Sequence, residues 1–160
     1  MADIRGFGMD NPRFGGEFGN SAVHTFKLRR AAMTSGDVFL FGVIPAGHII
    51  VGAELGNTAS TATAAMAIGF RNMDGTITSP DDGGATFQIP AVDYFFAAAT
   101  AILTAAGRLR WRVPGAIAGG LGTVLRLNKD IIIIGTLSVA SIATDTLIDV
   151  TFDTINVGVK

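Results

Sequence analysis

The sequence predicts an all-β protein, an antiparallel β-sandwich of jelly-roll-like topology with an extended N-terminal arm and one short helix. The chain has 160 residues, close to the usual size of one domain. Of these residues 49% are hydrophobic and the mean hydropathy is +0.47, which is enough apolar surface to form a core. Roughly seven or eight short strand-like segments follow one another at near-regular spacing, as in sandwiches and jelly rolls. An open barrel is the alternative, because strand number alone does not distinguish the two.

Glycines and phenylalanines are interleaved through residues 1–20 with no period of 2 or 3.6. We therefore expect an extended arm over 1–20 and a single β-sandwich domain over 21–160. Phe7, Phe14 and Phe18 are unusual in a solvated tail, so we expect them to dock on another subunit. The alternatives are a mobile terminus and an arm that folds over its own domain.

The predicted strands are short apolar or alternating segments bounded by Gly, Pro, Asn or Asp. We expect them over residues 37–44, 49–55, 64–70, 109–113, 123–127, 131–139 and 147–157. The first is apolar on both faces, which is typical of a strand buried within a sandwich. The last alternates over about six residues, so one of its faces is expected to contact water.

One helix is predicted over residues 93–106, which read DYFFAAATAILTAA. Asp93 is a suitable N-cap, and alanine has the highest helix propensity of all residues. The larger apolar residues do not fall on one stripe, so we expect the helix to be short.

Composition excludes several classes of protein. The net charge of -1 gives no basis for binding nucleic acid. The absence of cysteine removes disulfides, cysteine-based zinc sites, iron–sulfur clusters and thiol nucleophiles. No secretory signal opens the chain, and no apolar segment reaches the ~20 residues of a spanning helix. We therefore expect cytoplasmic synthesis, a soluble chain and no membrane partner.

No catalytic, metal or cofactor site is predicted. His24 and His48 have no acidic residue or histidine at a local ligand spacing, and no serine lies in a nucleophile elbow. We therefore expect that the chain is not an enzyme. Asp74, Asp81 and Asp82 form the densest acidic group, in a glycine-rich segment. This segment is interpreted as a solvated loop, and a calcium site is the alternative.

Three arginines, Arg108, Arg110 and Arg112, alternate with apolar residues, so in a strand they share one face. Like charges on one face of a sheet need counter-charges. Asp149 and Asp153 share a face of a later strand and could supply them within the domain. An acidic surface on a partner is the second interpretation, and phosphate groups are the third.

Two stretches resemble small β-rich structural proteins of tailed bacteriophages. The first is GDVFLFGVIPAGHIIVGAELGNTAS followed by AAMAIGF, and the second is DIIIIGTLSVASIATDTLIDVTF. Together they span residues 36–157 and leave the N-terminal arm uncovered. The resemblance implies a virion component such as a capsid decoration, cement or minor structural protein, and it carries no catalytic motif. It also implies a closed homo-oligomer, most simply a trimer.

The predicted function is binding to the outer surface of a phage capsid, which stabilises contacts between major capsid subunits. We expect the chain in the virion after synthesis in the host cytoplasm. Phe7, Phe14 and Phe18 are the expected docking side chains, and the three arginines are the expected polar contacts. A tail, neck or adaptor component of the virion is the first alternative. A carbohydrate- or host-surface-binding sandwich, with Trp111 as its platform, is the second.

Overall fold

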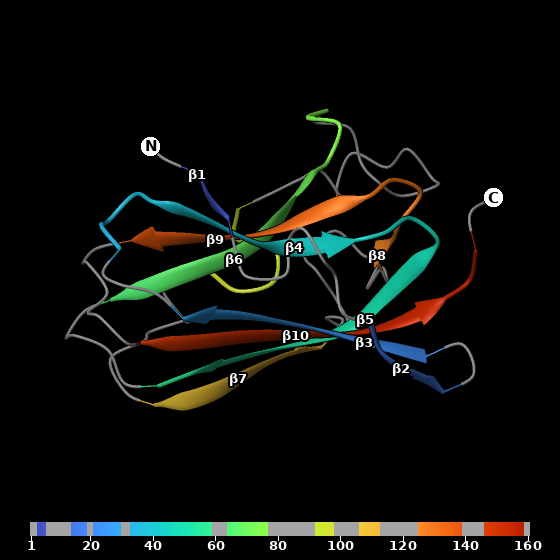
Figure 1. The fold of residues 1–160 in the computed structure, drawn as a ribbon, viewed down its shortest axis with the longest axis horizontal. Coiled ribbons are helices and arrows are strands. Elements are labelled where there is room, and N and C mark those ends of the chain that lie inside the picture. The colour runs from blue at the N-terminus through green and yellow to red at the C-terminus, as the bar shows by residue number, and fades with distance from the viewer. Residues whose placement is uncertain are drawn as a thin grey trace, which may run out of the picture.

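Two β-sheets packed face to face make up the structure, a computed structural model (Figure 1). It describes residues 3–5, 14–18, 21–29, 33–58, 64–76, 92–97, 106–112, 125–138 and 146–158. Every regular element within these ranges is a strand. The predicted all-β sandwich is therefore confirmed.

The first sheet has four strands. In spatial order they are β1 (Asp3–Arg5), β4 (Val38–Ile44), β9 (Ile131–Ser138) and β6 (Ala65–Asn72). Neighbouring strands run antiparallel, except that β1 lies parallel to β4. We call this the four-stranded sheet.

The second sheet has six strands, all paired antiparallel. In spatial order they are β2 (Phe14–Phe18), β3 (Ser21–Arg29), β10 (Leu147–Asn156), β5 (His48–Asn57) and β7 (Gly107–Arg112), with β8 (Leu125–Arg126) also paired to β5. Consecutive strands from β3 to β7 alternate between the two sheets, and so do β9 and β10. This alternation is compatible with the jelly-roll-like winding that the sequence predicts.

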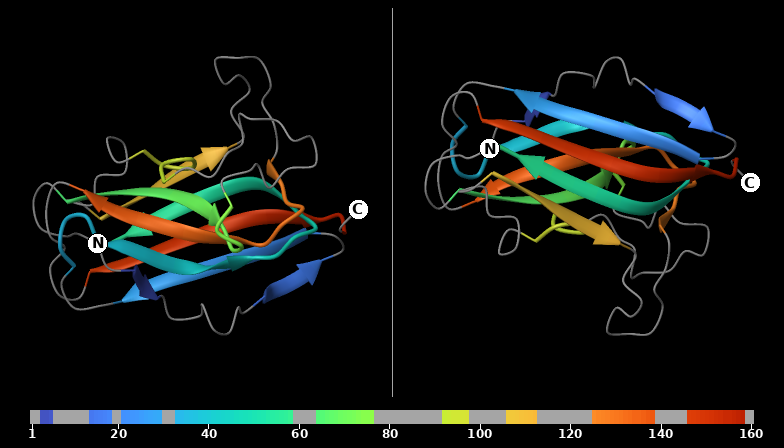
Figure 2. Two further views of the ribbon diagram at one scale, coloured as in Figure 1. Left: turned by 90° about the horizontal axis from the view of Figure 1, so that it is seen from above. Right: turned by 90° about the horizontal axis from the view of Figure 1, so that it is seen from below.

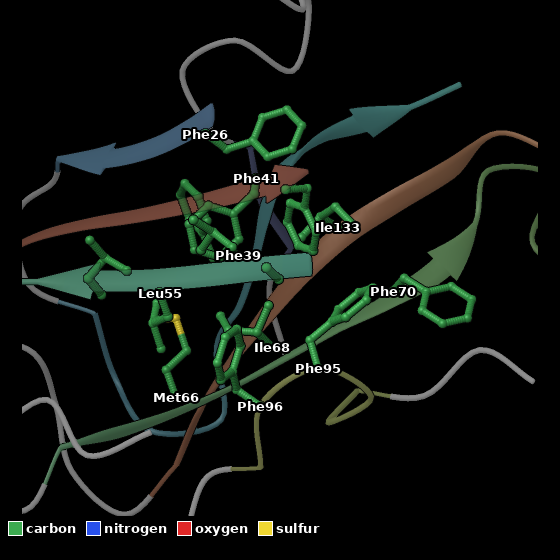
Figure 3. Packing of buried hydrophobic residues seen from close by; sticks show 14 of the residues in the cluster. Phe26, Phe39, Phe41, Leu55, Met66, Ile68, Phe70, Phe95, Phe96 and Ile133 are labelled. Carbon is green, nitrogen blue, oxygen red and sulfur yellow. The ribbon is translucent and has the colours of Figure 1, made fainter. Parts of the chain in front are cut away.

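The main core lies between the two sheets and is rich in aromatic rings (Figure 3). Its largest fully buried side chains are Phe39, Phe41, Phe70, Phe152, Ile44, Ile50, Leu55, Met66, Ile68 and Leu127. Strand β9 is buried on both faces: Ile131 and Ile133 join this core, whereas Ile132 and Ile134 pack in a second cluster on the other face. A strand without alternation therefore occupies the middle of its sheet.

Two glycines of the four-stranded sheet leave room for core side chains, one for a ring of the opposite sheet and one for neighbours in the same sheet. A Cβ atom on Gly42 of β4 would lie 2.3 Å from Phe26 Cε1, which belongs to β3 in the opposite sheet. A Cβ atom on Gly135 of β9 would lie 2.7 Å from both Phe41 Cε2 and Met66 Sδ. Both distances are far below ordinary carbon contacts of about 3.5–4.0 Å, so the core rings occupy space that only glycine leaves free.

Residues 92–97 do not form the first turn of the predicted helix; they make a turn and then a bridge. Phe96 N donates to Ile68 O at 3.0 Å, and Ile68 N donates to Phe96 O at 2.8 Å, so this segment lies along the edge of β6. The Tyr94 ring packs edge-on against Phe70, with centroids 5.1 Å apart. Burial of these rings outweighs local helix propensity here. Residues 98–105 lie outside the described part of the chain.

Two segments of the predicted arm are strands that pair with the domain itself. Strand β1 pairs with β4, and β2 pairs with β3 through Phe14 opposite His24 and Phe18 opposite Ser21. This pairing agrees with the alternative in which the arm folds over its own domain. Docking on another subunit stays a prediction, and Phe7 lies outside the described residues.

Candidate functional site

The outward side of the six-stranded sheet carries an ordered array of polar and charged residues, which we call the charged face. The registers of β3, β10, β5 and β7 align its residues in rows across the four strands. The rows are Lys27–Asp149–Gly56–Arg108, Thr25–Thr151–Glu54–Arg110 and Val23–Asp153–Gly52–Arg112. In each row an arginine of β7 occupies the end at the edge of the sheet.

One glutamate joins two of the arginines. Arg110 Nε donates to Glu54 Oε2 at 2.7 Å, and Arg108 Nη1 donates to Glu54 Oε1. Arg108 Nη1 also lies 3.8 Å from Asp149 Oδ2, although Asp149 belongs to β10, two strands away. Gly56 makes this reach possible, because a Cβ atom there would lie 2.7 Å from Asp149 Oδ1.

These ion pairs shift the pKa values of Glu54 and Arg108. Hydrogen bonds from Arg108 and Arg110 lower the pKa of Glu54, and the hydrogen bond to Glu54 raises the pKa of Arg108. The carboxylate side chains are only 22% (Glu54) and 18% (Asp149) exposed, whereas the arginine side chains are 63% (Arg108) and 70% (Arg110) exposed. The guanidinium groups thus keep donors directed to solvent.

The structure supports the intradomain interpretation of the arginines in part. Asp149 is a counter-charge, as predicted, but the principal partner is Glu54, which sequence reasoning missed. Glu54 is the one charged residue in the segment GAELG, so the local sequence does not indicate a partner for it. Only the register of β5 with β7 places it beside the arginines. Arg112 lies opposite Gly52 in the same register, and its side chain is outside the described part. Contacts of the arginines with a partner stay a prediction.

Two histidines meet between the sheets near one end of the sandwich. The rings of His24 on β3 and His48 on β5 lie edge to face, with centroids 5.2 Å apart, and both residues are buried. Desolvation, aided by the charge of His48, lowers the pKa of His24 from 6.5 to about 4. His48 Nδ1 lies 3.2 Å from Pro45 O. Within the described ranges, no group of three or more His, Cys, Asp or Glu residues could hold a metal ion.

The acidic loop is ordered around Asp74. Its Oδ1 accepts hydrogen bonds from Thr76 N at 2.9 Å and Thr76 Oγ1 at 2.7 Å, and its Oδ2 accepts one from Lys129 Nζ at 3.0 Å. These contacts, led by those from Thr76, lower the pKa of Asp74 to about 2. The lysine ammonium supplies positive charge at this carboxylate. Asp81 and Asp82 lie outside the described residues, so the calcium alternative stays untested.

No helix long and apolar enough to cross a membrane occurs in the described ranges.

Comparison with known proteins finds a likeness in fold but none in sequence. No protein-family model matches the chain, and no curated protein sequence matches it. A chain of the capsid of Ralstonia phage GP4 superposes with a TM-score of 0.64 at 15% identity, over 99% of this chain and 100% of that one. The fold is shared with phage capsid chains. A chain of the cyanophage Pam1 capsid asymmetric unit gives a TM-score of 0.56 at 14% identity, over 88% of this chain and 89% of that one.

Proposed function

We propose that the chain is a structural protein of a bacteriophage virion. In the finer form of this proposal, it is a capsid decoration or cement protein that binds the major capsid protein on the outer surface. The observation that carries the proposal is the likeness in fold to a chain of the Ralstonia phage GP4 capsid, because it extends over 99% of this chain and all of the other. The two chains therefore have the same fold over nearly their whole lengths.

The surface of the domain supports the same proposal. Its charged face pairs acids and bases within the domain, so the remaining exposed donors suit many weak and repeated contacts. On a particle, such contacts add through multivalency. A closed homotrimer would place three copies of each contact around one local symmetry axis. The proposal assigns no catalytic step to the chain.

The direct test is to purify the particles of the virus that encodes the chain and to determine their structure by electron cryomicroscopy. We expect density for this fold on the outside of the capsid shell, in contact with the major capsid protein. Density in the tail or neck would replace the decoration role by the alternative location. Particles purified to a single band in a density gradient can be checked for the chain by mass spectrometry. Its absence from them would refute the virion role. A glycan array tests the carbohydrate-binding alternative.

The predicted docking phenylalanines need a separate test. We expect the combined substitution of Phe7, Phe14 and Phe18 by alanine to reduce incorporation into particles while leaving the melting temperature of the free protein unchanged. A large fall in melting temperature would instead place these rings against their own domain. Unchanged incorporation and unchanged stability would remove the phenylalanines from the interface.

A further inference from the structure

Among the residues that the structure describes, strand β7 lies at one edge of the six-stranded sheet. The order of strands ends at β7, which lies at the margin of the sandwich in both figures of the fold (Figures 1 and 2). Residues 106–110 are all exposed, including Leu109, whose apolar side chain is 36% exposed. A strand in this position presents unpaired backbone groups that can pair with another extended chain.

The register identifies which residues of β7 present their backbone to this edge. Thr58 N donates to Leu147 O at 2.9 Å, so the backbone of Thr58 points toward β10. Backbone direction alternates along an antiparallel strand, so every second residue of β5 counted back from Thr58 also points toward β10. Gly56 and Glu54 are two of these residues, and they stand opposite Arg108 and Arg110, respectively. The N–H and C=O groups of both arginines therefore point away from β5, toward the edge.

The same edge carries an excess of positive charge. Three arginines stand along β7, and the carboxylates of Glu54 on the adjacent strand and Asp149 on the next strand oppose them. Glu54 holds the side chains of Arg108 and Arg110 in place, and both side chains are still largely exposed. Donors that are already ordered lose little conformational entropy when a ligand binds.

We infer that the β7 edge binds an extended acidic segment of a neighbouring protein subunit by addition of a β-strand. Main-chain hydrogen bonds to Arg108 and Arg110 would provide the affinity, and carboxylates at alternate positions would pair with the exposed guanidinium groups. The inference rests on the proposed function, because it names the contact through which a neighbouring subunit is held. The competing interpretation is that the arginines only prevent edge-to-edge aggregation.

A peptide probe separates the two interpretations. The probe is a capped peptide of alternating Glu and Thr, and its control is the same peptide with Gln in place of Glu. We expect the acidic peptide to shift the amide signals of β7 in ¹⁵N spectra and to slow hydrogen exchange at Arg108 and Arg110. The neutral peptide should bind more weakly. Equal binding of the two peptides, shifts confined to other strands, or no binding at millimolar peptide would overturn the inference.

Variants of one position separate charge from backbone. Arg110→Gln removes one guanidinium and should weaken binding of the acidic peptide about fivefold at low salt, the effect of one favourable cross-strand charge pair. Arg110→Pro also removes the edge N–H, which pairs with no strand of the described residues, and should abolish binding while β7 persists. Lys27→Gln is the matched control, since it makes the same charge change on β3, away from the edge. If Lys27→Gln weakens binding as much as Arg110→Gln, the site is not the β7 edge.

Failure of this inference differs from failure of the proposed function. If wild-type chain is found in particles and Arg110→Pro is incorporated equally well, the β7 edge is not the contact but the virion role stands. If wild-type chain is absent from particles, the virion role fails whatever the peptide does.

Discussion

The close approach of Gly42 to Phe26 predicts a large effect of one methyl group. In Gly42→Ala, the new Cβ would lie 2.3 Å from Phe26 Cε1, 2.5 Å from Cδ1 and 3.2 Å from Cζ. The ring must therefore move by more than about 1 Å to restore ordinary contact distances. Phe26 is buried and packs against Phe152, with ring centroids 6.2 Å apart, so it has little room.

Overpacking of this kind costs about 1–3 kcal/mol. Replacing glycine in a strand returns about 0.5–1 kcal/mol. Because contacts of 2.3 and 2.5 Å place this variant in the upper half of the overpacking range, we expect Gly42→Ala to lower the free energy of unfolding by about 1–2.5 kcal/mol, and the melting temperature by about 2–10 °C. Urea unfolding at one fixed protein concentration measures the first value, and calorimetry measures the second.

Two further variants make this prediction specific. Phe26→Val removes the three ring atoms that the methyl group meets, so the double variant should lose at least about 1 kcal/mol less than the sum of the single losses. Gly56→Ala is the control: its Cβ meets the terminal oxygens of Asp149, a side chain that can rotate toward water. We expect it to change stability by less than about 0.5 kcal/mol. Gly42→Ala that is as stable as wild type would refute the packing argument.

Three other predictions concern charged groups. The pKa of His24 in the folded chain, about 4, is below 6.5, so the unfolded chain binds more protons between these values. Stability should therefore be complete about one pH unit above 6.5 and fall by about 3 kcal/mol as the pH drops to 4; urea titrations in which His24→Leu keeps the same slope would contradict this. Glu54→Gln removes the main counter-charge of Arg108 and Arg110, so its melting temperature should fall more at ~20 mM than at ~500 mM salt, and an effect independent of salt would contradict this prediction. Lys129→Met should raise the pKa of Asp74 from about 2, while Thr76 keeps it below 3.8; carboxyl ¹³C titration measures this, and an unchanged value speaks against the ion pair.

Strand prediction succeeded where the apolar pattern was strong. The seven predicted strands correspond to β4–β10, and β9 was found by its run of isoleucines even though it does not alternate. Strand β3 was missed although Ala22, His24, Phe26 and Leu28 alternate with outward residues, because the histidine and lysine reduced its apolar signal. Strands β1 and β2 lie in a glycine-rich segment without a period, and only pairing with β4 and β3 defines them.

The candidate site was predicted by residue type but not by partner. Alternation correctly placed Arg108 and Arg110 on one face of a strand. Their main counter-charge, Glu54, lies more than 50 positions earlier and becomes their neighbour only through the register of β5 with β7. Local sequence carries no signal for such a pairing. The start of the predicted helix shows the converse case: Asp93 is a suitable N-cap, but over residues 93–97 the packing of Tyr94 and Phe95 against Phe70 decides the local conformation.

The last two strands of the chain each occupy the interior of a sheet, β9 between β4 and β6 and β10 between β3 and β5. During synthesis, the earlier strands therefore emerge from the ribosome before the strands that join them exist. The four-stranded sheet cannot be completed before Ser138 has been translated, and the six-stranded sheet cannot be completed before Asn156. Pairing between strands that are far apart in the sequence slows folding. Early strands that stay unpaired in the meantime favour aggregation. We therefore expect chaperones to raise the folding yield of the nascent chain until its final ten-residue strand is complete.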